Sequence, residues 1–126
     1  MPATEPIRNK EQLKALANFF LTKNQIRNYT LVILTTHTAL RISDVLDVKW
    51  TDVYSEQEKT FYSYVTLIER KTKKHKIIRL NKEAAHALQL CYAQKRNRYI
   101  FASNRGDQPI TRQQARRIIR KGVEAV

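Results

Sequence analysis

Apolar residues recur at intervals of three and four along the first part of the chain, which predicts amphipathic helices there. Residues 10–21 are expected to form the first helix, preceded by a capping box of Asn9 and Gln12. Its core-facing positions are Leu13, Leu16, Ala17 and Phe20. A second helix is expected from a cap at Asn24 to about Thr36, because burial of its nearly continuous apolar face outweighs its β-branched content.

A short third helix is expected over residues 41–48, after a break near Thr38. Its helical spacing divides the side chains into a core-facing set and a solvent-facing set. The residues expected to face the core are Ile42, Val45 and Leu46, and those expected to face away from it are Asp44 and Asp47.

The middle of the chain changes to the pattern of β-strands. Aromatic and β-branched residues alternate with others over 61–68, and a second such run covers 75–80, with a polar and basic stretch between the two. The two runs predict a β-hairpin. A further short strand is expected over residues 99–101.

The last part of the chain returns to helical spacing. Asn81 is expected to begin a helix that continues to about Lys95. Thr111 and Gln114 form a capping box for a final helix through about Lys121. The stripes expected to be buried are Ala84, Ala85, Leu88 and Cys91 or Tyr92 in the first of these helices, and Ala115, Ile118 and Ile119 in the second.

This order of elements predicts a mostly helical α+β fold, with helices, then a small antiparallel hairpin, then helices. A chain of 126 residues fits a single domain over 1–126 and is too short for two of typical size. Residues 1–8 are expected to be a flexible N-terminus. The single cysteine, Cys91, has no disulfide partner, and no stretch is apolar enough to span a bilayer, so a cytoplasmic protein is expected.

Charge narrows the possible functions. Lys and Arg number 24 against 11 Asp and Glu, and the net charge of +13 favours a polyanionic partner, with nucleic acid first and an anionic membrane second. One concentration of bases lies in the hairpin, from Arg70 to Arg79. No His, Cys or carboxylate pair has the spacing of metal ligands, so no metal site is expected.

The second concentration of bases lies in the final helix, where Arg112, Arg116 and Arg120 are spaced by four. Its first turn carries Thr111, Arg112 and Gln113, which are residue types able to bind phosphates or base edges. Because the apolar stripe leaves these polar residues on other faces, the helix could lie in a DNA major groove.

Residues 38–50 begin Thr-Ala-Leu-Arg-Ile-Ser-Asp, and the segment resembles the first active-site box of the tyrosine recombinases, the phage integrase family. That box reads Thr-Gly-Leu-Arg-x-x-Glu/Asp. The resemblance implies that Arg41 binds the scissile phosphate and that Asp44 helps to shape the site. Ala39 stands where the family usually has glycine.

Residues 69–80 resemble the β-hairpin of the same family, which carries a catalytic lysine. Lys71 aligns best with that lysine, and Lys73 is the alternative because a run of similar residues allows a slip in register. Lys73, Lys74 and Lys76 are expected to bind DNA because they belong to the basic stretch of this hairpin.

Residues 101–123 resemble the stretch that follows in the family, including a helix that members commonly dock in the major groove. The residues thereby expected to bind DNA are Thr111, Arg112, Gln113 and Arg116. The likeness covers about Ile7 to the C-terminus and implies part of a tyrosine-recombinase catalytic-domain fold.

In this family, a tyrosine hydroxyl attacks a DNA phosphodiester and forms a 3′-phosphotyrosyl bond, while the lysine protonates the departing 5′ oxygen. Covalent capture of this kind conserves the bond energy for rejoining. No metal or nucleotide cofactor takes part. The resemblance therefore implies a role in DNA integration or site-specific recombination, and double-stranded DNA as the partner.

The family also has a His-x-x-Arg box and then the tyrosine nucleophile after the docking helix, and this chain contains neither. Four tyrosines have apolar or strand spacing, and Tyr54 and Tyr99 lie upstream of the position expected for the nucleophile. The chain is therefore expected to be a truncated catalytic domain that binds DNA without cleaving it.

The parent recombinase, of bacterial, phage or mobile-element origin, is expected to oligomerise on DNA, and the fragment alone to be a monomer or weak dimer. A non-catalytic DNA-binding regulator would fit the same basic elements. An RNA-binding domain is a third interpretation, although the sequence lacks the glycine and aromatic signatures of common RNA-binding modules.

Overall fold

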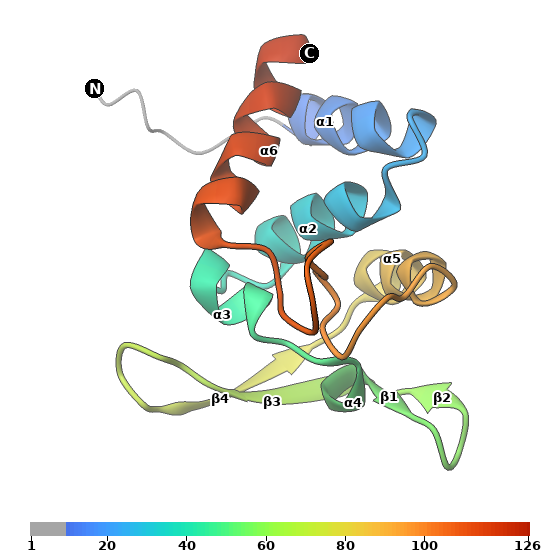
Figure 1. The fold of residues 1–126 in the computed structure, drawn as a ribbon, viewed down its shortest axis with the longest axis vertical. Helices are drawn as coiled ribbons and strands as arrows, with labels where there is room; N and C mark the ends of the chain where they lie inside the picture. Colours follow the sequence, from blue (N-terminus) through green and yellow to red (C-terminus); the bar gives the residue numbers. More distant parts are fainter. Residues whose placement is uncertain (1–9) are drawn as a thin grey trace.

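A computed structural model of the chain describes residues 10–126 (Figure 1). Within them the fold is mostly helical, with two small antiparallel sheets of two strands each, which confirms the predicted α+β class. The expectations for a flexible segment over 1–8 and for Asn9 in a capping box fall outside the described residues.

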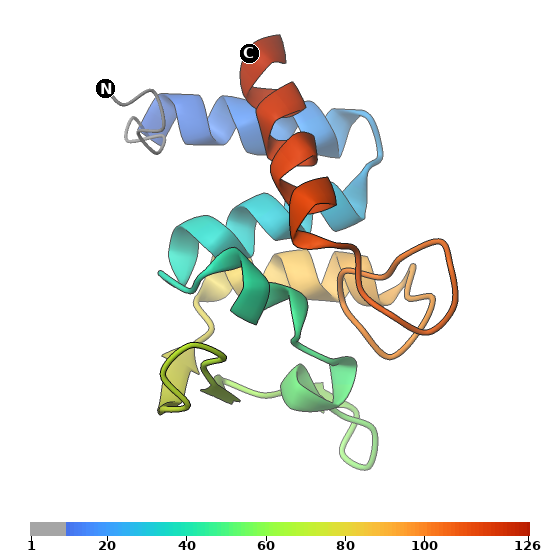
Figure 2. The same cartoon turned by 60° about the vertical axis from the view of Figure 1, so that its left-hand side comes forward.

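The helices are α1 (Lys10–Thr22), α2 (Ile26–His37), α3 (Ile42–Leu46), α4 (Trp50–Val53), α5 (Lys82–Tyr92) and α6 (Arg112–Ala125). The strands are β1 (Tyr54–Ser55), β2 (Thr60–Phe61), β3 (Tyr64–Ile68) and β4 (His75–Arg79). The helices α1, α2 and α5 lie in successive layers over the β3–β4 hairpin, and α6 runs from α3 past α2 to α1 (Figures 1 and 2).

The turn between α1 and α2 differs from its prediction. Asn24 was expected to cap α2, but the N-cap residue is Gln25, and Asn24 has a φ of 58°. In that left-handed conformation the Asn24 N–H donates to the carbonyl of Leu21 (3.0 Å) and the Gln25 N–H to that of Phe20 (2.9 Å). Asn24 therefore ends α1 instead of beginning α2, a role for which asparagine is also suited.

The segment after α2 is more divided than the sequence predicts. The third helix ends at Leu46 instead of residue 48, and the separate short helix α4 begins at Trp50. The strand expected over 99–101 is also wrong, because Tyr99 only forms an isolated bridge with Lys49. The predicted strand over 61–68 is divided too, since Phe61 belongs to β2 and β3 begins at Tyr64.

The N-cap residues of the last two helices are confirmed, but the capping box expected at Thr111 is only half formed, because the Gln114 side chain accepts no hydrogen bond from the Thr111 N–H in the described chain. The Asn81 side chain accepts a hydrogen bond from the N–H of Ala84 at 2.9 Å, and the Thr111 side chain accepts one from the N–H of Gln114 at 3.1 Å. The ends differ from their predictions, because α5 ends before Lys95 and α6 continues past Lys121.

The core lies between the helical layers, and Cys91 belongs to it, as predicted. Its thiol is 4 % exposed and contacts the Ile100 carbonyl oxygen at 3.9 Å. Burial raises the pKa of the Cys91 thiol to about 11. Since the thiolate is the reactive form, this cysteine fills space in the core and is chemically inert.

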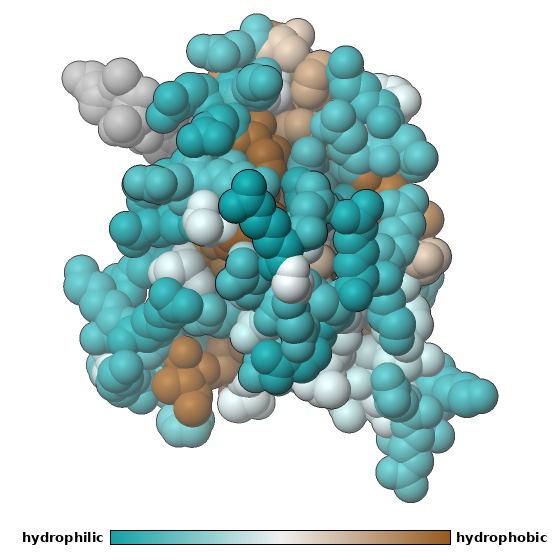
Figure 3. All heavy atoms as spheres, viewed as in Figure 1, coloured by the Kyte–Doolittle hydropathy of each residue, from teal (hydrophilic) through white to brown (hydrophobic). Residues whose placement is uncertain are grey.

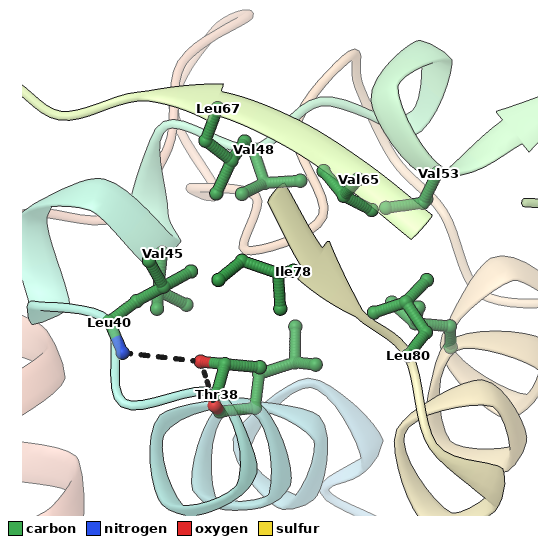
Figure 4. Close-up of a pocket in the computed structure, with 11 residues that line it drawn as sticks. Thr38, Leu40, Val45, Val48, Val53, Val65, Leu67, Ile78 and Leu80 are labelled. Carbon is green, nitrogen blue, oxygen red and sulfur yellow. Dashed lines mark hydrogen bonds between the residues drawn. The ribbon is translucent and has the colours of Figure 1, made fainter. Parts of the chain in front are cut away.

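The β3–β4 hairpin turns one face towards the helices. Val65 pairs with Ile78 in register, and both are buried beside a small apolar cavity of about 20 Å³ (Figure 4). On the other side of that cavity, Thr38 donates a hydrogen bond to the Leu34 carbonyl (2.6 Å) and accepts one from the Leu40 N–H (3.4 Å). This threonine shapes the turn from α2 into α3.

Candidate nucleic-acid interface

Arg41 stands at the start of α3 in an extended conformation, with φ −70° and ψ 150°. Its carbonyl oxygen accepts the N–H groups of Asp44 and Val45, both at 3.0 Å, so its backbone is fixed by the helix. Its side chain is exposed and forms no hydrogen bond or ion pair with any other residue in the described part of the chain. The guanidinium is therefore available to an anion from solvent.

Ala39, two residues before Arg41, has a φ of 58°, in the left-handed region that favours glycine. The resemblance to the family rests partly on a box in which glycine holds this position. An alanine here is strained by about 1 kcal/mol, because its Cβ crowds the following carbonyl.

Replacing Ala39 with glycine is accordingly expected to raise the free energy of unfolding by about 0.5 to 1 kcal/mol. Urea denaturation followed by circular dichroism would measure it. Ala93→Gly is the matched control, because Ala93 has a φ of −62° and glycine should lower the stability there. A loss of stability in both variants would contradict a strained Ala39.

Asp44 is 4 % exposed, so the prediction that it faces away from the core is wrong. Its Oδ1 accepts the backbone N–H of Arg70, in the hairpin loop, at 3.1 Å. Its Oδ2 is buried and has no hydrogen-bond partner in the described chain. The face of α3 that carries Asp44 is thus covered by the hairpin loop, a contact between residues 26 positions apart that helical periodicity does not reveal.

A second contact joins α3 to the same loop. The Arg70 guanidinium forms a bidentate ion pair with the Asp47 carboxylate. Its Nε donates to Oδ2 at 2.5 Å and its Nη2 donates to Oδ1 at 2.7 Å. These hydrogen bonds raise the pKa of the Arg70 guanidinium. Because Arg70 directly precedes Lys71, the two contacts fix the start of the loop beside Arg41.

Breaking the Arg70–Asp47 pair is expected to loosen the hairpin loop. In Arg70→Gln or Asp47→Asn, amide hydrogen exchange over residues 69–74 should become about threefold faster, a modest effect because the pair is partly exposed. The double variant should exchange no faster than either single one. Arg79→Gln, on an exposed β4 residue, is the matched control, and equal acceleration there would contradict this assignment.

The predicted hairpin lysines are not equivalent. Lys71, Lys73 and Lys74 are exposed in the loop between β3 and β4, and Lys73 has a φ of 62° with its N–H bonded to the Glu69 carbonyl (2.9 Å). Lys76 lies within β4, half-buried, with its ammonium 3.9 Å from the Glu69 carboxylate. Three of the four therefore project into solvent beside α3, while Lys76 faces an acid of its own hairpin.

The exposed residues at the start of α6 include all four that the sequence selected, Thr111, Arg112, Gln113 and Arg116. The helix packs on α3 and α2, and its first turn lies beside α3, which begins directly after Arg41 (Figures 1 and 2). Sequence reasoning left out Arg117, which is also exposed. It follows Arg116 directly, and projecting the bases onto a helical wheel would have shown it.

The orientation of α6 depends on its contact with α1. A Cβ added to Gly122 would lie 2.5 Å from Leu16 Cδ1 and 2.8 Å from Phe20 Cζ, so the two helices meet where a side chain does not fit. Ala115 and Gly122 are buried, whereas Ile118 and Ile119, predicted to be buried, are only half-buried.

Hydrophilic side chains cover most of the molecular face seen in Figure 3.

The described residues contain no cluster of His, Cys, Asp or Glu able to hold a metal ion. In the same part of the chain, no helix has the length and apolar character required to cross a membrane.

This arrangement of helices is found in solved recombinases. Superposition on XerA recombinase covers 98% of this chain and 43% of that one, with a TM-score of 0.74 and 22% identity. Superposition on lambda integrase (residues 75–356) bound to DNA covers 99% and 45%, with a TM-score of 0.67 and 17% identity. The fold is thus that of part of a recombinase.

Sequence comparison is more specific. The chain is 35% identical over 126 residues to the probable integrase/recombinase YoeC of Bacillus subtilis (strain 168), covering 99% of this chain and 66% of YoeC. The model of the phage integrase family matches residues 8–126. The chain belongs to the phage integrase family, and it spans about two thirds of the curated relative and less than half of the solved structures.

Proposed function

We propose that this chain binds duplex DNA as the first part of a tyrosine-recombinase catalytic domain, acting in site-specific recombination by strand cleavage and rejoining. The observation that carries the proposal is the meeting of three exposed basic elements around α3: Arg41, the Lys71 loop and the start of α6. The structure of lambda integrase bound to DNA, which shares this fold, supports it.

In this proposal, Arg41 holds the scissile phosphate, because its guanidinium is exposed and its forked donors match phosphate oxygens. Lys71 protonates the leaving oxygen. Lys71 is preferred over Lys73 because it directly follows Arg70, whose backbone and side chain are both anchored to α3. Asp44 positions the loop by accepting the Arg70 N–H, and it does not itself contact DNA.

We also propose that the chain by itself does not cleave DNA. In the described residues, no tyrosine hydroxyl hydrogen-bonds to Arg41, Asp44 or Lys71. Burial and the nearby Glu83 raise the pKa of Tyr29, and desolvation and Tyr92 raise that of Tyr54. A raised pKa is the opposite of what an activated nucleophile requires, which argues against Tyr29 and Tyr54 as nucleophiles.

Fluorescence anisotropy with a labelled duplex tests the binding proposal. Arg41→Gln and Lys71→Gln should each weaken binding severalfold and reduce the salt-dependence slope by about one. Lys59→Gln, in the turn between β1 and β2, is the matched control and should leave both unchanged. Competition with single strands and structured RNA at two salt concentrations completes the test, and RNA that competes as well as duplex at the higher salt would overturn the proposal.

Incubation with a suicide DNA substrate tests the absence of cleavage. No covalent adduct should form, because a nucleophile beside Arg41 is required for it. An adduct detected by denaturing electrophoresis would overturn this part of the proposal while leaving the binding part intact.

A further inference from the structure

The helix α2 runs from the turn after α1 to the turn before α3 (Figure 1). A second basic site lies at the start of α2, whereas Arg41 follows its end. There, a cavity of about 310 Å³ opens between the start of α2, the end of α5 and nearby residues up to Asn104. Three bases line it, Arg27, Lys95 and Arg96, and none of its described lining residues is an aspartate or glutamate. The length of α2 separates it from Arg41 by about 18 Å, so it is distinct from the proposed DNA-binding surface.

Arg27 carries a charge that no acid neutralises in the described chain. Its Nη1 donates to the Ala102 carbonyl at 3.0 Å, and its Nε and Nη2 share the Asn28 Oδ1 at 3.3 Å. Desolvation, and then the positive charge of Arg96, lower the pKa of Arg27. Two guanidinium groups thus repel each other beside the cavity, and an anion between them would relieve that repulsion.

Arg96, which follows α5, also lines the cavity and is held by Asn104. Its Nη1 donates to Asn104 Oδ1 at 2.5 Å, which leaves its other N–H groups without a partner in the described chain. The Lys95 ammonium donates to the hydroxyl of Tyr92 at 3.0 Å and lies 4.3 Å from the centroid of that ring, so it is held beside Tyr92. Of the three lining bases, the two arginines offer forked guanidinium donors, which match phosphate oxygens better than a single ammonium does.

Backbone donors add to this arrangement. Ile26, Arg27 and Asn28 begin α2 and are among the residues that line the cavity, and their backbone N–H groups have no acceptor in the described chain. The N-cap residue Gln25 provides no side-chain cap, and the first turn holds no acid. An α-helix of this length places partial positive charge at the same point.

We propose that this cavity binds a phosphoryl group, held by the Arg27 and Arg96 guanidinium groups and the first N–H groups of α2. Four features favour a phosphate over a neutral ligand: two arginines, three open N–H groups, the absence of an acid from the described lining residues and a volume of about 310 Å³. The phosphoryl group belongs either to free phosphate or to a nucleic-acid backbone.

Titration with inorganic phosphate, at constant ionic strength with chloride as the balancing anion, tests the site by amide NMR. The Ile26, Arg27 and Asn28 amide signals should shift and saturate. Arg96→Gln should weaken phosphate binding about tenfold, because it removes a charge-assisted donor. Arg105→Gln is the matched control, since Arg105 is exposed in the same loop region and does not line the cavity.

Shifts that do not saturate, or equal weakening in the two variants, would overturn the proposal, because either result means screening by ions alone. Arg41→Gln should retain the shifts of the three α2 amides, which separates this site from the proposed DNA-binding surface. A second titration with a short duplex identifies the source. Shifts of the same amides that Arg96→Gln weakens assign the site to a nucleic-acid backbone, and shifts with inorganic phosphate alone assign it to free phosphate.

Discussion

Gly122→Val is expected to lower the free energy of unfolding by about 2 kcal/mol. A Cβ at this position would lie 2.5 Å from Leu16 Cδ1, and Leu16 and Phe20 are 1 % and 2 % exposed, so neither has room to move aside. The effect runs against helix propensity, which favours valine over glycine. Urea denaturation followed by circular dichroism would measure the loss.

Ala125→Val is the matched control, because Ala125 lies on the exposed side of the same helix and should cost only a few tenths of a kcal/mol. The clash at Gly122 should also tilt α6 away from α1 and move its arginines relative to α3. DNA affinity should therefore fall in Gly122→Val under conditions in which the protein remains folded. Unchanged stability and affinity would show that the two helices do not pack at Gly122.

Replacing the exposed arginines of α6 with glutamine is expected to lower duplex affinity by about a hundredfold or more at moderate salt. The four substitutions are at Arg112, Arg116, Arg117 and Arg120. The slope of log affinity against log salt should become less steep by up to about three or four, since each phosphate contact contributes about 0.9. Anisotropy titrations at several salt concentrations would measure both quantities.

A matched set of four lysine-to-glutamine changes separates this effect from net charge. Those changes are placed at Lys14, Lys23, Lys59 and Lys82, which are exposed on other elements. Both variants lose four positive charges, so a general electrostatic attraction would weaken equally in the two. A loss confined to the α6 variant supports docking of this helix, and equal losses would contradict it.

Periodicity predicted the long elements well, because their apolar stripes extend over several turns. Helices α1, α2, α5 and α6 and the β3–β4 hairpin all occur where the sequence places them. The short elements were not predicted from the sequence. Helix α4 has four residues and strand β1 has two, which is too few to show a hydrophobic period. Asn24 was misplaced because asparagine suits both a helix start and a left-handed helix end.

The candidate residues were selected from the sequence, whereas the contacts between them could not be predicted from it. Arg41, Lys71 and the first turn of α6 were selected from motifs, and the structure places these elements around α3. The burial of Asp44 and the pairing of Arg70 with Asp47 depend on contacts between residues more than twenty positions apart. No local pattern encodes such contacts, because they arise only when the hairpin folds back over α3.

The hairpin that carries Lys71 has one buried face and one solvent-exposed face. Val65 and Ile78 are buried, whereas Ile68 and Ile77 on the opposite face are 59 % and 69 % exposed. A two-stranded hairpin alone is marginally stable in water, so packing against the helices provides most of the stability of this one. On warming, this hairpin should therefore melt locally before the helical layers unfold. The temperature limit for DNA binding would then lie below the melting temperature of the domain.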